Sequence, residues 1–399
     1  MERLLEEIDR IVERRRGEAI RLLRELIRTP SLSGEEGEAA LIVGEHLRAA
    51  GLKVEVDEIH NVKAEMRGIG GGHSILFNGH LDHVPPGTMA DPYSAKIMDG
   101  SAFGVEGEVI YGRGACDMKG GVAAMAMALS ILRELETPLL GDVKLAAVAQ
   151  EETSGYGTLK TIRDGFLGDL AVIGEATNLN IHLGHRGAIT VKMEIRGRSC
   201  HASAPDRGVN PLYKAAEIIQ EIRSRIIPML PTHPEYGETT LAVTMLKTRP
   251  EAVNVIPGVA EITLDCRNTP NLTPEELRRM LELLIEELRR RDPELDASVE
   301  IMRRIEDRPF TGYRVDPDQP MVREAKRAVE EAIKRDVKLG MWRFMTDGRF
   351  YAWRGIPAVG FGPGEERFAH TDQDHIRIED YINSIKAYAW MACRICGVK

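Results

Sequence analysis

The sequence has few of the features that mark secreted, membrane-spanning or nucleic-acid-binding proteins. Its five cysteines are scattered over 399 residues, and so sparse and odd a set does not make a disulfide scaffold. No stretch approaches the roughly 18 uninterrupted apolar residues of a transmembrane helix, and the charged N-terminal segment lacks the apolar centre of a signal peptide. A net charge of −9 argues against a phosphate-backbone partner, which needs clustered lysine and arginine. We therefore expect a cytoplasmic protein with no membrane and no nucleic-acid partner.

The rest of the composition is that of a globular protein, with 43% hydrophobic and 29% charged residues. The length allows two domains or one large core. Cys393 and Cys396 have redox or zinc spacing, but they lie in an apolar C-terminal stretch with helical periodicity. Buried helix cysteines are the favoured interpretation, and a thiol pair is the alternative.

The order of apolar runs predicts an α/β fold. Apolar strands at 74–78, 143–149 and 171–173 are separated by helical segments such as 121–135. Such strands are typical of a mainly parallel sheet with helices on both faces. Residues 304–399 return to this alternating character.

The middle of the chain has a different pattern. Residues 187–303 read as strand, helix, strand, strand, helix, strand, with Asn210 as one helix cap and Thr273 with Glu276 as a capping box at the other. This βαββαβ order describes a self-contained α+β unit. We predict a discontinuous domain formed by 1–186 and 304–399, interrupted by an inserted domain at 187–303.

The stretch GHLDHV at 79–84 follows an apolar strand and contains the first candidate site. His80 and Asp82 are two residues apart, so they share one face of the strand, whereas His83 points the other way. A metal-bound imidazole commonly gives its second N–H to a carboxylate, and such a pair suits this arrangement. Taken alone, the pair also fits an ordinary surface or core contact.

Further acids and a histidine stand where other strands or glycine-rich turns end. Taken alone, each also fits a solvated turn or a helix cap. Together they suit a pair of borderline or hard divalent ions: zinc, cobalt or manganese. These residues are Asp117, Glu151, Glu152, Glu175 and His370.

The motifs resemble those of a known enzyme family. GHLDHVPPG, GRGACDMKGG, QEETSG, GEAT, CHASAPDRGVNP, NVIPGVAEITLDCR and FAHTDQD occur in order between about residues 20 and 395. They resemble the dinuclear zinc peptidases that include acetylornithine deacetylase, succinyl-diaminopimelate desuccinylase, aminoacylase and glutamate carboxypeptidase.

The resemblance implies a role for each matching residue. His80 and Glu175 would hold one metal, Glu152 and His370 the second, and Asp117 would bridge the two. Asp82 would orient His80, and Glu151 would be the general base. His201 would stabilise the oxyanion from the partner subunit of a homodimer formed through 187–303, although a plain turn histidine is the alternative. The residues expected to hold a substrate carboxylate are Arg267, Asn254, Arg186 and Arg349.

The expected activity is metal-dependent hydrolysis of the amide bond of an N-acyl amino acid. Two divalent ions, Zn²⁺ or else Co²⁺ or Mn²⁺, would be the cofactors. A carboxypeptidase or dipeptidase with the same machinery is the first alternative. A catalytically inactive binding protein on the same scaffold is the second.

Overall fold

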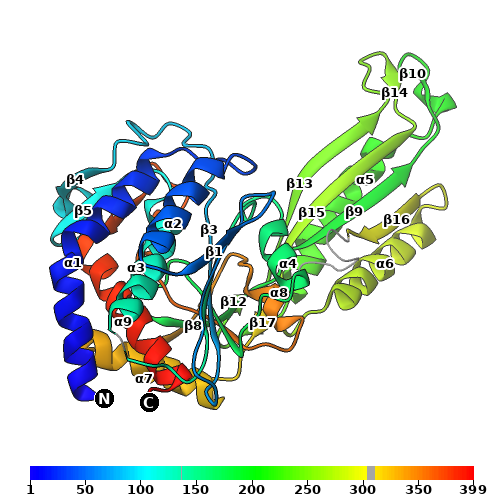
Figure 1. Cartoon of the computed structure of the whole chain (residues 1–399). Helices are drawn as coiled ribbons and strands as arrows, with labels where there is room; N and C mark the ends of the chain where they lie inside the picture. Colours follow the sequence, from blue (N-terminus) through cyan, green and yellow to red (C-terminus); the bar gives the residue numbers. More distant parts are fainter. Residues whose placement is uncertain (136, 303–310) are drawn as a thin grey trace. The chain divides into compact units, whose positions relative to one another are not determined.

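The computed structural model describes residues 1–135, 137–302 and 311–399. The chain divides into two compact units (Figure 1). Unit 1 comprises Met1–Gly184, Val315–Gly340 and Thr346–Lys399, and unit 2 comprises His185–Arg314 and Met341–Met345. The inserted segment expected at 187–303 lies within unit 2, and its predicted end at 303/304 falls outside the described residues.

Unit 1 is built on a large sheet whose strands run in the spatial order β1-β2-β6-β3-β7-β19-β8. The central strands β6, β3, β7 and β19 are parallel to one another, and β1, β2 and β8 add antiparallel pairs on either side. This parallel centre confirms the predicted α/β class. The bounds are β1 (Lys53–Val56), β2 (Val62–Met66), β3 (Ile75–His80), β6 (Val143–Val148), β7 (Leu170–Ile173), β8 (Ile181–His185) and β19 (Ala358–Gly360).

Helices cover both faces of this sheet. In Figure 1, α1, α2, α3 and α9 lie on one side of the strands, and α4 and α8 lie on the other. β3 is buried along its whole length, as expected for a strand covered on both faces. The bounds are α1 (Glu2–Arg28), α2 (Gly37–Ala49), α3 (Gly120–Glu134), α4 (Tyr156–Arg163), α7 (Pro320–Ile333), α8 (Gly348–Ala352) and α9 (Ile378–Cys396).

The segment Ala115–Glu134, which contains α3, is long and apolar enough to pass a length-and-composition test for a membrane span. Its most apolar 18-residue window is entirely buried inside the protein, and core helices pass the same test. Cys393 and Cys396 are buried and unpaired in α9, in line with the favoured interpretation.

A small antiparallel sheet lies beside the main one, in the order β20-β5-β4. It is formed by β4 (Lys96–Asp99), β5 (Glu108–Tyr111) and β20 (His375–Arg377). His375 is paired with Tyr111, so the segment after His370 is tied to the glycine-rich loop that follows β5.

Unit 2 contains a four-stranded antiparallel sheet in the order β13-β15-β9-β16. With α5 and α6 it follows the βαββαβ order along the chain. Asn210 caps α5, and Thr273 with Glu276 forms the capping box of α6. The bounds are β9 (Ile189–Arg196), β10 (Cys200–His201), α5 (Pro211–Glu221), β11 (Thr232–His233), β12 (Gly237–Glu238), β13 (Thr240–Arg249), β14 (Val255–Ile256), β15 (Val259–Arg267), α6 (Pro274–Arg291), β16 (Asp296–Ile301) and β17 (Tyr313–Arg314). β18 (Leu339–Trp342) spans one unit boundary.

Glycines let the start of α3 rest against the ends of the parallel strands. A Cβ on Gly121 would overlap the carbonyl oxygen of Gly174, just after β7. A Cβ on Gly79 in β3 would meet the methyl groups of Met118 and Met125. This close approach brings the Asp117 loop next to Glu175.

We expect Gly121→Ala to destabilise the protein by about 1–3 kcal/mol, because the added methyl group must push α3 away from backbone atoms. Gly17→Ala is the matched control, since that helical glycine has room for a methyl group and alanine is the better helix former. Thermal unfolding should give a lower Tm for Gly121→Ala and an equal or higher Tm for Gly17→Ala. Equal Tm values for both variants would contradict the close approach of α3 to the backbone of Gly174.

Candidate metal centre

Three parallel strands deliver acids and a histidine to one edge of the main sheet. His80 is the last residue of β3, Glu151 and Glu152 follow β6, and Glu175 follows β7. The three strands are parallel, so their carboxyl ends meet at the same edge, where ligands bind in open α/β sheets.

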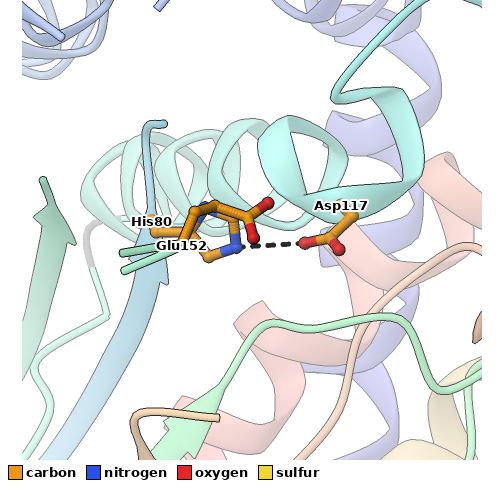
Figure 2. A group of neighbouring side chains, drawn as sticks. All are labelled: His80, Asp117 and Glu152. Atoms are coloured by element: carbon orange, nitrogen blue, oxygen red, sulfur yellow. Dashed lines mark hydrogen bonds and ion pairs between the residues drawn. The ribbon is translucent and has the colours of Figure 1, made fainter. Parts of the chain in front are cut away.

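Asp117 lies between the two imidazoles. Its Oδ1 is 3.0 Å from His80 Nε2, and its Oδ2 is 3.0 Å from His370 Nε2. Figure 2 shows His80, Asp117 and Glu152 converging, with the contact from His80 to Asp117 dashed. Asp117 is 7% exposed, and its peptide bond to Met118 is cis. One carboxylate thus faces a histidine on each side.

Each imidazole meets a second carboxylate. His80 Nε2 is 3.4 Å from Glu175 Oε1, and His370 Nε2 is 3.0 Å from Glu152 Oε1. The candidate ligand atoms of His80, Asp117 and Glu152 lie within 4.8 Å of one another, as do those of His80, Glu151 and Glu175. The five residues predicted as metal ligands are therefore brought together.

The electrostatics of the cluster reflect its burial and its charge. Burial raises the pKa of Glu175 to about 8, and the neighbouring Asp117 charge adds to that rise. Hydrogen bonds to Asp117 and Glu152 raise the pKa of His370 to about 10. Burial lowers the pKa of His80, but its contacts with Asp117 and nearby carboxylates outweigh this effect and raise the pKa well above its usual value. The cluster thus attracts positive charge.

Glu151 also belongs to this cluster, since its carboxylate lies within 4.8 Å of the ligand atoms of His80 and Glu175. Burial raises the pKa of Glu151 well above its usual range, and the Asp347 charge adds to the rise, whereas Arg349 opposes it. A carboxyl group whose pKa is raised in this way suits proton transfer.

The turn that carries Glu151 and Glu152 is held by side chains from elsewhere in unit 1. Asp82 accepts the N–H of Glu151 at Oδ1 and that of Glu152 at Oδ2, each at 3.1 Å. Glu36 Oε1 accepts the N–H of Gln150 at 2.9 Å. Gln150 has a φ of 60°, a left-handed conformation that costs a non-glycine residue about 1–3 kcal/mol and persists only when neighbours hold it.

The side chains of His80 and His83 have different hydrogen-bond partners. His80 Nδ1 is 2.9 Å from the main-chain oxygen of Asp82 and 3.5 Å from its carboxylate. His83 Nε2 accepts the N–H of Ser31, and its Nδ1 donates to the carbonyl oxygen of Val84. His83 therefore fastens a loop and faces away from His80, as predicted, although β3 ends at His80 and the predicted alternation of strand faces does not extend to His83.

The residues predicted to bind substrate lie in both units. Arg349 is buried in unit 1, donates to the Thr346 carbonyl oxygen and lies 3.6 Å from Asp347 Oδ1. In unit 2, the exposed His201 is hydrogen-bonded to Ser203, and the Asn254 carbonyl oxygen accepts the Ala202 N–H, so His201 and Asn254 lie close together.

The two remaining arginines also belong to unit 2. Arg186 donates to the main-chain oxygen of Glu238, and Arg267 is paired with Asp265 at 2.8 Å. Gly187 donates to the Asn268 oxygen, so the chain next to Arg186 meets the chain next to Arg267.

Two buried acids that support the site were not assigned from the sequence. Glu36 holds Gln150, and Asp374 accepts N–H groups of the loop that carries Asp117. The FAHTDQD motif contains Asp374, but its spacing gives no sign of the distant backbone groups that the side chain binds. Glu36 precedes a helix and resembles an ordinary first-turn acid.

The donor set fits divalent ions. Imidazole nitrogens and carboxylate oxygens are the ligands of catalytic zinc and of harder divalent metals. Within the described part of the chain, the buried Oε2 of Glu175 has no hydrogen-bond partner. A buried anionic oxygen is costly to leave unpaired, and a cation at this position would remove the cost.

Comparisons with known proteins agree with this geometry. The chain is 28% identical to the succinyl-diaminopimelate desuccinylase of Gluconacetobacter diazotrophicus, covering 95% of this chain and 97% of that protein. It is 28% identical to the acetylornithine deacetylase of Myxococcus xanthus, covering 84% of each. The solved structure of the YXEP protein of Bacillus subtilis, a dinuclear metal-binding peptidase of the M20 family, matches with a TM-score of 0.72 and 18% identity, covering 96% of this chain and 99% of that one.

The match to a family profile extends over most of the protein. Residues 76–394 match the profile of peptidase family M20/M25/M40, and that range includes all the residues of the cluster. The chain therefore belongs to peptidase family M20/M25/M40, as a metal-dependent amidohydrolase.

Proposed function

We propose that this protein removes the acyl group from N-acyl amino acids by hydrolysing their amide bond. The observation that carries the proposal is Asp117 between two histidines, with Glu151 at the edge of the same cluster. Its similarity over nearly the full length to a desuccinylase and a deacetylase favours an N-acyl amino acid as substrate. The cytoplasmic location stays a prediction.

The cluster would hold two divalent ions. His80 and Glu175 would bind one, Glu152 and His370 the other, and Asp117 would bridge the two. When bound, such ions polarise an amide carbonyl and make water more acidic. We propose Zn²⁺, with Co²⁺ or Mn²⁺ as substitutes.

Glu151 would move the proton in this reaction. It would take a proton from the attacking water and deliver it to the nitrogen of the leaving amine. Because Asp82 holds the N–H groups of both Glu151 and Glu152, the proton-transfer group and the neighbouring ligand share one rigid turn. Asp82 would thereby position both the base, Glu151, and the metal ligand His80.

Unit 2 would provide the dimer contact and the oxyanion donor. β13 is an edge strand of its sheet and exposes Val243, Met245 and Leu246. Exposed apolar edge strands favour pairing with another chain. In such a homodimer, His201 would act on the substrate of the partner subunit, and Asn254, Arg267 and Arg186 would bind its carboxylate. In unit 1, Arg349 would do the same.

The substrate proposal is tested with N-acetyl amino acids, N-succinyl amino acids and dipeptides, each with added Zn²⁺, Co²⁺ or Mn²⁺. Glu151→Gln should lower kcat by about 10²–10⁴ and leave the metal content unchanged, because the base is removed but the ligands remain. Glu45→Gln, an exposed change on α2, is the control. Hydrolysis of dipeptides alone would favour a peptidase instead. Full activity of Glu151→Gln would exclude Glu151 as the base.

The dimer proposal is tested by mixing two inactive variants. His201→Ala should lower kcat by about 10²–10³, the usual effect of losing an oxyanion donor. When subunits exchange, a mixture of His201→Ala and Glu151→Gln proteins should regain activity, because one site of the hybrid would be complete. A mixture of Asp117→Asn and Glu151→Gln should stay inactive, since one subunit supplies both residues to its own site and each site of the hybrid therefore keeps one of the changes. No recovery despite verified exchange would contradict a role for His201 across a dimer.

A further inference from the structure

Asp374 is a fully buried carboxylate that binds backbone groups of another loop. It is 0% exposed. Its Oδ2 accepts the N–H of Gly114 at 2.7 Å, and its Oδ1 accepts the N–H of Cys116 at 2.8 Å. The Arg113 guanidinium lies 3.1 Å from Oδ2. Both carboxylate oxygens are thus used on residues 113–116.

The loop that Asp374 holds leads directly into Asp117. Asp117 follows Cys116 in the chain, so the second N–H bond lies one residue from the carboxylate that faces both histidines. The same loop is also fixed by main-chain contacts, because the Gly112 N–H donates to the Asp374 carbonyl oxygen and β5 is paired with β20. The position of residues 112–116 therefore depends on where Asp374 lies.

His370 belongs to the same segment as Asp374. Between them, Thr371 Oγ1 donates to the Phe368 carbonyl oxygen at 2.9 Å and accepts the Gln373 N–H at 3.1 Å. His370 itself has a φ of 60°, so its backbone is held in a conformation that costs free energy. One short segment thus carries a candidate ligand at one end and, at the other, the anchor for a second ligand.

We propose that Asp374 is a positioning residue that fixes Asp117 relative to His370 and so sets the affinity of the site formed by Asp117, Glu152 and His370. The proposal rests on the metal-binding function proposed above. Asp374 holds the Asp117 loop through backbone N–H groups, and its role parallels that of Asp82, which holds the 151–152 turn through two N–H groups. The two carboxylates fasten two of the three segments that supply ligands to this site, and Asp374 itself lies in the third, which carries His370.

Asp374→Asn separates this positioning role from a packing role. The asparagine side chain has nearly the same size and shape as aspartate but has one hydrogen-bond acceptor oxygen fewer. An amide can present only one oxygen, so one of the two N–H groups would face an NH₂ group instead. A buried N–H left without an acceptor is costly, and the loop should shift. Loss of a supporting contact of this kind typically weakens metal binding by about 10–100-fold.

Asp380→Asn is the matched control. Asp380 is also buried, and it is paired with Arg377 at 3.3 Å close by in the same segment. Its substitution weakens an ion pair of similar length that is more exposed than that of Asp374 with Arg113. Within the described part of the chain, Asp380 has no hydrogen bond to residues 113–116.

Metal-free wild-type protein and both variants are titrated with Zn²⁺ against a chromophoric chelator, and the visible absorption of their Co²⁺ forms is recorded. We expect the second equivalent to bind about 10–100-fold more weakly to Asp374→Asn, with an altered Co²⁺ spectrum, and wild-type values for Asp380→Asn. Wild-type affinity in Asp374→Asn, or an equal loss in both variants, would overturn the proposal.

Amide hydrogen exchange of metal-free wild-type protein tests the anchor without a variant. The Gly114 and Cys116 amides should be protected before any metal is added, because their acceptor is a side chain of the protein. Rapid exchange there would overturn the proposal even if Asp374→Asn fails to fold. A wild-type protein that binds no divalent ion would instead refute the proposed function, while the exchange result would still report on Asp374.

Discussion

The site depends on the cost of gathering carboxylates where little water reaches them. Asp117 and Glu175 are almost fully buried, and Glu152 lies close to them. Like charges at this range repel, and burial disfavours the charged form. In the protein alone, His80 and His370 between the acids partly offset this cost. Two divalent ions would offset it far more fully, so the arrangement that is costly without metal would also be the source of metal affinity.

Such a cluster needs rigid support, and the fold provides it in two ways. His80, Glu152 and Glu175 are placed by the ends of parallel strands, which are buried and fixed by their neighbours. Asp117 and His370 lie on loops, and side-chain carboxylates hold the backbone of the Asp117 loop and of the turn at residues 151–152. Asp82 binds the N–H groups of Glu151 and Glu152, and Asp374 binds those of Gly114 and Cys116. The glycines at 79, 121 and 174 allow α3 to approach closely enough for Asp117 to join the cluster.

Much of the fold and of the candidate site could be predicted from local patterns in the sequence. The apolar strands and the caps at Asn210 and Thr273 follow from periods of two and 3.6 residues and from capping chemistry. The separation of His80 from His83 was predicted from a strand that in fact ends at His80, and hydrogen bonds to Ser31 and Val84 place His83 instead. The gathering of Asp117, Glu152, Glu175 and His370 followed from strand ends and from the family resemblance. The roles of Glu36 and Asp374 could not be predicted, because each depends on a backbone group more than a hundred residues away in sequence. The edge strand β1 and its neighbour β2 were also not predicted, since both are short and β1 is half-exposed, which gives a weak signal.

The central claim is that His80, Asp117, Glu152, Glu175 and His370 form one site for two divalent ions. The most direct test is a titration of metal-free protein with Co²⁺, followed by visible absorption and by elemental analysis after gel filtration. The account predicts two tightly bound equivalents per chain in the wild-type protein and a loss of both sites in Asp117→Ala, because Asp117 faces both histidines. A single equivalent in the wild-type protein, or two equivalents retained in Asp117→Ala, would contradict it.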